Sequence, residues 1–418
     1  MSVARRESTL VYVGLGLIAL HVLDDNFFQP QPGTSAGDHL VSGLVLFAVI
    51  VAAALVYGRL RAGWRAATAL LFGVFGIVAS IEAFYYTSEV GASGDDYTGF
   101  AAALGGGLLI LVGVATLWRT RRTDDRLAWR YGRRLLLAAG AVVFSFVVVY
   151  GLGSAYVYTH TSRAVVPTPN LGTPHEQVAF TTSDGLELKG WYIPSKNRAA
   201  VIAFPGRRGP QKPARMLARH GYGVLLFDRR GESESEGDPN IFGWAMDRDL
   251  EAAVTFLQRR PDVDRNRIGG IGLSVGGEML LQAAAEDDRI KAVVSEGAGI
   301  RSVREAIHME KRNDKLGATL IFGFATLGTA IFSNHAPPPG LEDLVPDIAP
   351  RPVFFIYAER GQGGEELNER FYEKAGRPKT LWQVPDSGHT GGIDARPQEY
   401  ERRVVGFFDR ALLQGSGG

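Results

Sequence analysis

The chain has 418 residues, with 45 basic against 44 acidic side chains and no cysteine. Balanced charge and the lack of a basic cluster with interleaved aromatics give no indication of nucleic-acid binding. The lack of cysteine excludes disulfides, thiolate metal sites and thiol catalysis, and no H-E-x-x-H pattern is present, so we predict neither a metal nor an organic cofactor.

The first part of the chain contains five apolar runs, each near the ~20 residues that a helix needs to cross the hydrocarbon core of a membrane. Helices of soluble bundles usually keep a polar stripe, and these runs hardly have one. We therefore predict that residues 1–159 form a transmembrane module of about five helices. The runs cover residues 9–23, 40–58, 66–86, 98–118 and 135–157.

The charges between the runs predict an orientation, because basic loops stay in the cytoplasm. Basic residues precede the first run and occupy the second and fourth loops, whereas the first and third loops are acidic. The N-terminus is then cytoplasmic and everything after about residue 160 is extracytoplasmic. The basic positions are Arg5, Arg6, Arg59, Arg61 and Arg65, with seven arginines between residues 119 and 134.

Residues 160–175 contain three prolines among small polar residues and read as a linker. Beyond it, apolar strands alternate with amphipathic helices, which favours a mostly parallel sheet covered by helices on both faces. We expect an α/β domain over residues 176–414. The expected strands lie in 177–194 (a hairpin), 199–206, 222–228, 267–274, 290–298, 351–359 and 379–385, and the expected helices in 213–221, 241–260, 275–287 and 399–413.

The run Gly272-Leu273-Ser274-Val275-Gly276 fits G-x-S-x-G, between an expected strand and an expected helix. In that setting the serine occupies a sharp turn with its hydroxyl exposed. A serine hydroxyl needs a base, and the base needs an orienting group. Ser274 is therefore the candidate nucleophile.

His389, in "VPDSGHTGG", follows the last expected strand and is the candidate base. The acid should lie at the end of strand 351–359, where Glu359 is our first choice and Glu365 in the following loop our second. Backbone N–H groups that stabilise an oxyanion would come from Val275 and from the loop at Gly206 and Arg207.

An insertion, residues 299–348, separates two of the expected strands and contains the apolar stretch 316–332. A sixth membrane crossing there would place Ser274 and His389 on opposite sides of the membrane. We therefore expect a cap over the site, whose apolar face lines a pocket or rests on the bilayer.

Residues 176–412 resemble the α/β-hydrolase superfamily, especially its serine-aminopeptidase-like, dienelactone-hydrolase-like and Bem46-like branch. The resemblance rests on "FPGRRG", "LARHGYGVLLFDRRGESESEG", "IGLSVGG" and "VPDSGHTGG". It implies a hydrolase sheet with a cap and a Ser-His-acid triad. Two departures stand out: Phe204-Pro205 replaces the usual histidine of the oxyanion loop, and the acid loop has no aspartate.

These patterns predict a membrane-anchored serine hydrolase that cleaves ester or other acyl bonds through an acyl-enzyme. Its expected partners are a small acyl or lipid-like substrate and the membrane; the sequence defines no oligomeric state. Two alternatives stay open: a non-catalytic sensing or binding module coupled to the helices, and a serine peptidase of the same fold. Fold alone does not choose the substrate.

Overall fold

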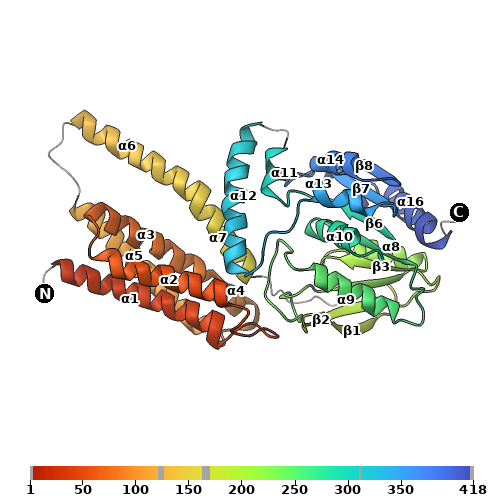
Figure 1. Cartoon of the computed structure of the whole chain (residues 1–418), viewed down its shortest axis with the longest axis horizontal. Coiled ribbons are helices and arrows are strands. Elements are labelled where there is room, and N and C mark those ends of the chain that lie inside the picture. Colours follow the sequence, from red (N-terminus) through yellow and green to blue (C-terminus); the bar gives the residue numbers. More distant parts are fainter. Residues whose placement is uncertain (1–2, 121–126, 162–169, 310–311, 415–418) are drawn as a thin grey trace. The chain divides into compact units, whose positions relative to one another are not determined.

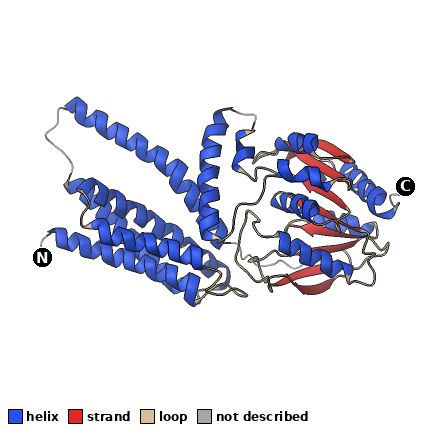
Figure 2. Ribbon diagram, in the orientation of Figure 1, coloured by secondary structure: helices blue, strands red, loops and turns tan. Residues whose placement is uncertain are grey.

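The computed structural model describes residues 3–120, 127–161, 170–309 and 312–414 (Figure 1). The chain divides into two compact units. The helical unit comprises Met1–Thr161 with Leu320–His335, and the sheet unit comprises Ser162–Thr319 with Ala336–Gly418. Figure 2 shows that strands are confined to the second of them.

The helical unit contains five helical stretches that are long and apolar enough to cross a membrane, as the sequence predicts. Three of them change geometry along their length. The first passes from α1 into a π-helical turn, Asp24–Phe28; α3 gives way to α4 at Ser80; and α6 passes into α7 through a π-helical turn, Ser145–Val149. The helices are α1 (Val3–Leu23), α2 (Leu40–Tyr57), α3 (Ala62–Ala79), α4 (Ile81–Val90), α5 (Asp96–Arg119), α6 (Leu127–Phe144) and α7 (Tyr150–His160).

Small residues let α3 and α5 pack with their backbones in close approach. A Cβ added at Gly73 would lie 2.9 Å from the carbonyl oxygen of Gly106, and one added at Gly106 would lie 2.7 Å from the carbonyl oxygen of Gly73. Close backbone approach through small residues is how apolar helices associate where water supplies no driving force. Helix α1 meets α5 in the same way at Gly14 and Gly105.

The sheet unit is built on eight strands in the order β1-β2-β4-β3-β5-β6-β7-β8. Strands β1 and β2 form the antiparallel hairpin at one edge, and β3 to β8 are parallel. The strands are β1 (Glu176–Thr181), β2 (Glu187–Ile193), β3 (Ala200–Phe204), β4 (Gly223–Phe227), β5 (Ile268–Leu273), β6 (Ala292–Glu296), β7 (Val353–Arg360) and β8 (Lys379–Gly388).

Helices cover both faces of this sheet, so its central strands are apolar on both sides. Along β4, Leu225 and Phe227 enter one core while Val224 and Leu226 enter the other, as alternation along a strand requires. The expected mostly parallel sheet is confirmed. One face carries α9 (Asp247–Gln258), α10 (Val275–Glu286), α13 (Leu341–Leu344) and α14 (Leu367–Lys374), and the other carries α8 (Gln211–Arg219) and α16 (Pro397–Phe408).

The insertion between β6 and β7 contains α11 (Val303–Ile307), α12 (Arg312–Phe332) and α13. The apolar part of α12 belongs to the helical unit, where it packs on α7. A Cβ at Gly328 would lie 2.7 Å from Cβ of Ala155, and the rings of Phe332 and Tyr156 meet edge to face with centroids 5.3 Å apart. The insertion therefore joins the two units through the chain; a cap over the site stays a prediction.

Candidate active site

The turn between β5 and α10 holds Ser274 in a strained conformation, with φ 53° and ψ −126°. Non-glycine residues rarely adopt a positive φ, and such strain is concentrated at functional sites. The flanking glycines are required by space: a Cβ at Gly272 would lie 2.3 Å from the carbonyl oxygen of Gly276, and a Cβ at Gly276 would lie 2.3 Å from Cδ of Pro205. The G-x-S-x-G spacing therefore forms the expected sharp strand-to-helix turn.

The loop after β8 brings His389 to this serine. Its Nε2 lies 2.8 Å from Oγ of Ser274, and its Nδ1 contacts the carboxylate of Glu365. The contact to Glu365 implies that Nδ1 carries a proton, which leaves the Nε2 lone pair facing the hydroxyl. The imidazole can then accept the hydroxyl proton.

Glu365 is 1 % exposed and is held by its own hydrogen bonds. Its Oε2 accepts the backbone N–H of Ala358 at 2.9 Å, and its Oε1 accepts that of Gln362 at 3.4 Å. The hydrogen bond to Glu365 raises the pKa of His389 above the ordinary value of 6.5, and its negative charge acts in the same direction. Glu365 thus orients the imidazole and stabilises its protonated form.

Glu359, our first choice for the acid, lies at the exposed end of β7 and accepts the backbone N–H of Asp386 at 2.8 Å. The structure brings Glu365 to His389 instead. The chain after β7 turns back on itself, with Gly363 at φ 65° and Gly364 at φ 87°. Such positive φ values suit glycine, and the return places Glu365 beneath the histidine.

Of the expected oxyanion donors, Arg207 is already engaged. Its backbone N–H donates to Oδ1 of Asp228 at 2.9 Å, and its guanidinium binds Asp228 and Glu234. Because this N–H is occupied, Arg207 is better read as a structural residue, which corrects its expected role. In the described part of the chain, no hydrogen bond uses the N–H of Gly206 or Val275.

Two further glutamates stand near the histidine and were missed in the sequence. Glu278 accepts the N–H of Gly299 at 3.1 Å, and desolvation raises its pKa to about 7. Glu296 is buried at the end of β6, where it accepts hydrogen bonds from the N–H of Gly392 (2.9 Å) and the hydroxyl of Tyr400 (2.6 Å). Both raise the pKa of His389 through their charge. A charged residue closing a buried parallel strand was the available signal for Glu296.

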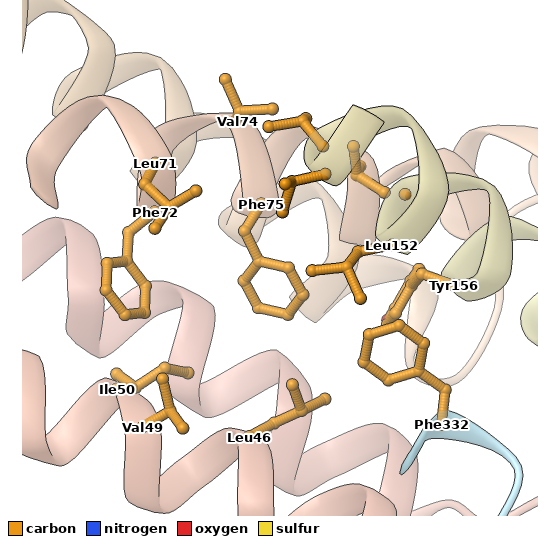
Figure 3. A pocket seen from close by; sticks show the side chains of 14 residues that line it. Leu46, Val49, Ile50, Leu71, Phe72, Val74, Phe75, Leu152, Tyr156 and Phe332 are labelled. Carbon is orange, nitrogen blue, oxygen red and sulfur yellow. The ribbon is translucent and has the colours of Figure 1, made fainter. Parts of the chain in front are cut away.

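The helical unit has a cavity of about 200 Å³ with an apolar lining (Figure 3). Phe75, Leu152, Tyr156 and Phe332 surround one end of it, and Leu71, Phe72 and Ile50 surround the other. These residues come from α2, α3 and α7 and from the end of α12.

Comparison with known proteins gives a consistent picture. Residues 155–339 match the family model of X-Pro dipeptidyl-peptidase (S15 family). The chain is 26% identical over 293 residues to YfhR of Escherichia coli (strain K12), a protein without a characterised function, covering 67% of this chain and 95% of that one. It is 37% identical over 130 residues to the polyketide transferase grgF of Penicillium sp, covering 29% and 44% respectively.

Among solved structures, an esterase of Pyrococcus furiosus, Pf2001, superimposes with a TM-score of 0.50 at 25% identity. The match covers 60% of this chain and 98% of the esterase. The order of strands, the turn at Ser274 and these similarities agree with one another.

Proposed function

We propose, on the premise that the sheet unit is an α/β-hydrolase domain, that the chain is a membrane-anchored serine hydrolase. The observation that carries the proposal is the line Ser274–His389–Glu365, with Oγ and Nε2 2.8 Å apart. A hydroxyl, a base and an orienting carboxylate in this order are the requirements of nucleophilic acyl transfer.

In the proposed reaction, Ser274 Oγ attacks the acyl carbonyl while His389 Nε2 takes its proton. The carbonyl oxygen becomes an oxyanion that accepts hydrogen bonds from the N–H groups of Val275 and Gly206. The imidazolium, stabilised by Glu365, then gives its proton to the leaving alcohol or amine, and an ester to Ser274 remains. Water attacks this acyl-enzyme and loses a proton to His389 Nε2. The imidazolium then returns that proton to the leaving Ser274 Oγ, the carboxylic acid is released, and the hydroxyl and the neutral imidazole are restored.

A lipid-like acyl substrate is our first choice. Five helices are long and apolar enough to hold the chain in a bilayer, and the apolar part of α12 links the hydrolase insertion to those helices. The outer side of α12 exposes Leu320 at 43 % and Leu327 at 52 %, which suits contact with acyl chains. From the arginines between the apolar runs, we also propose that the N-terminus is cytoplasmic and the hydrolase domain extracytoplasmic.

The test is hydrolysis of p-nitrophenyl esters of increasing chain length by the full-length protein in detergent. Ser274→Ala should reduce kcat/KM by about 10⁴-fold or more, since the nucleophile is lost. Ser183→Ala, an exposed serine in the β1–β2 turn, is the matched control and should leave kcat/KM unchanged. Equal activity of Ser274→Ala and wild type would refute the proposal, and a folded wild type without activity would favour the binding-module alternative.

A serine peptidase is the second candidate, supported by the match to the X-Pro dipeptidyl-peptidase model over residues 155–339. It would use the same Ser274 and differ in what the substrate site recognises. Comparison of kcat/KM for an X-Pro p-nitroanilide and for a medium-chain p-nitrophenyl ester separates the two. We expect the ester to be preferred; preference for the anilide would assign the peptidase activity.

The proposed orientation is tested separately with a C-terminal fusion to a reporter that is active only outside the cytoplasm. Seven arginines between residues 119 and 134 are the main determinant of the orientation. We expect an active reporter. An inactive reporter on a well-expressed fusion would place the hydrolase domain in the cytoplasm and leave the chemistry untouched.

A further inference from the structure

Three metal-ligand side chains converge in the helical unit, far along the sequence from the hydrolase motifs. They are Asp25, Glu82 and His160, which we call the acid–histidine cluster. Each offers one ligand atom, and these atoms lie within 4.8 Å of one another. All three residues are buried, with exposed fractions of 7 %, 2 % and 9 %. Burying two carboxylates beside one imidazole is costly unless a cation or protons share the site.

Each member of the cluster sits where a helix departs from regular geometry. Asp25 lies in the π-helical turn Asp24–Phe28 that follows α1, Glu82 lies in the first turn of α4 after the break at Ser80, and His160 is the last residue of α7. π-Helical turns are often found at functional sites. These irregularities aim side chains of three separate helices at one point.

The hydrogen bonds of His160 fix which ring nitrogen faces the carboxylates. Its Nδ1 lies 2.8 Å from the carbonyl oxygen of Tyr156 and 2.9 Å from Oγ1 of Thr159, whose hydroxyl donates to backbone carbonyls. A carbonyl only accepts, so the contact with Tyr156 implies a proton on Nδ1. In the neutral ring Nε2 then presents a lone pair. The ring also stacks on Tyr156, with centroids 3.9 Å apart. A histidine whose second nitrogen donates to a backbone carbonyl is the usual arrangement of a metal ligand.

The distance between two of the ligand atoms is compatible with an ion bound between them. Nε2 of His160 lies 3.7 Å from Oδ2 of Asp25, beyond hydrogen-bond length. Two ligands bound at ~2.1 Å to a tetrahedral ion stand about 3.4 Å apart. Oδ2 of Asp25 also accepts a hydrogen bond from the Asn26 amide at 3.1 Å, and Asn26 is held in turn by Ser42. Such support for a carboxylate is expected of a metal site's surroundings.

Another buried carboxylate of the helical unit has its negative charge neutralised in a different way. Glu7, 7 % exposed, binds the guanidinium of Arg119 at 2.6 Å and accepts the hydroxyl of Tyr57 at 3.1 Å. Arg65 stands 3.6 Å from it. Glu7 is thus neutralised by arginines, a set of groups that differs from the one imidazole and two carboxylates of the acid–histidine cluster.

From this donor set we infer that the acid–histidine cluster binds a divalent transition-metal ion, of which Zn²⁺ is the representative. One imidazole nitrogen and two carboxylate oxygens suit Zn²⁺, whereas Ca²⁺ and Mg²⁺ prefer oxygen ligands alone. The inference does not depend on the proposed hydrolase activity, because Ser274 and His389 belong to the other unit.

The test is equilibrium dialysis of Zn²⁺ against the full-length protein in detergent, purified without a polyhistidine tag and freed of metal with a chelator. Wild type should bind one Zn²⁺ per chain, with a tenfold excess of Ca²⁺ failing to displace it. Glu82→Gln and His160→Gln should weaken binding by about 100-fold or more, since even loss of a supporting group costs 10–100-fold. Glu7→Gln, a buried glutamate of the same unit, and Ser274→Ala should bind as wild type does.

Thermal unfolding of wild type keeps the test decisive if the ligand variants do not fold, because an ion that binds only the folded protein raises Tm. Zn²⁺ should raise Tm where the same concentration of Ca²⁺ does not. Absence of stoichiometric Zn²⁺ binding and of a Tm shift in wild type would overturn the inference. So would unchanged Zn²⁺ affinity in folded Glu82→Gln and His160→Gln proteins.

Discussion

The two units of this chain assemble their polar centres in opposite ways. In the sheet unit, the centre consists of Ser274, His389 and Glu365. Each lies in the loop after a parallel strand, so the carboxyl ends of the strands bring the three side chains together. In the helical unit, the acid–histidine cluster draws on irregular points of three helices. In this chain the strand ends position the groups of one centre, whereas a π-helical turn, a helix break and a helix end position those of the other.

The largest expected effect is the loss of kcat on removing the carboxylate that orients His389. Glu365→Gln keeps the shape of the side chain but removes the charge that orients and stabilises the His389 imidazolium. Loss of a triad carboxylate costs about 10⁴-fold in kcat. We expect a loss of that order in ester hydrolysis assays.

Glu359→Gln is the matched control, because Glu359 contacts the backbone of Asp386 at the exposed end of β7. Its kcat should stay close to that of wild type because Glu359 does not contact His389, and its free energy of unfolding should change by no more than about 0.5 kcal/mol. The reverse order of effects would return the acid's role to Glu359 and contradict the contact of Glu365 with His389 as the functional one.

A smaller effect is expected from crowding the helical unit. Gly106→Leu puts a side chain where α5 meets the backbone of α3, and overpacking of this kind typically costs about 1–3 kcal/mol in the free energy of unfolding. Gly107→Leu is the control, because a Cβ there meets no atom within 4 Å. We expect thermal unfolding in detergent to show a lower Tm for Gly106→Leu alone; equal Tm values would contradict this packing.

The smallest expected effect is a shift in the pH dependence of kcat/KM, which again compares Glu365 with Glu359. The reaction needs neutral His389, and Glu365 raises its pKa above 6.5, so kcat/KM should fall as the pH drops through that raised pKa. Glu365→Gln should move this acid limb to lower pH, and Glu359→Gln should leave it in place. A pH–rate profile whose acid limb does not move in Glu365→Gln would mean that the carboxylate does not act on the histidine.

The sequence predicted the sheet and the turn at Ser274 because their determinants are local. Continuous apolar runs predict buried parallel strands, and the G-x-S-x-G spacing predicts the sharp turn between a strand and a helix. The choice between Glu359 and Glu365 depended on how a glycine-rich loop folds back, and the loss of Arg207 as an oxyanion donor depended on a contact with Asp228 made 21 residues later.

The helical unit was predictable only as helices. The apolar composition predicted five helices long enough to cross a membrane. It does not predict which side chains of different helices come together. The members of the acid–histidine cluster are dozens of residues apart in the sequence. They converge because of a π-helical turn and a helix break, and no sequence motif predicts either of these. The same applies to the packing of Gly328 on α7, which assigns part of the insertion to the helical unit.

The proposed activated serine is tested most directly by labelling the full-length protein with a fluorophosphonate, an electrophile that reacts readily with activated serine hydroxyls. Mass spectrometry of the peptides then locates the adduct. We predict one adduct per chain, on Ser274, and none on the folded Ser274→Ala variant. A folded wild type that takes up no label, or a Ser274→Ala variant labelled to the same extent, would contradict it.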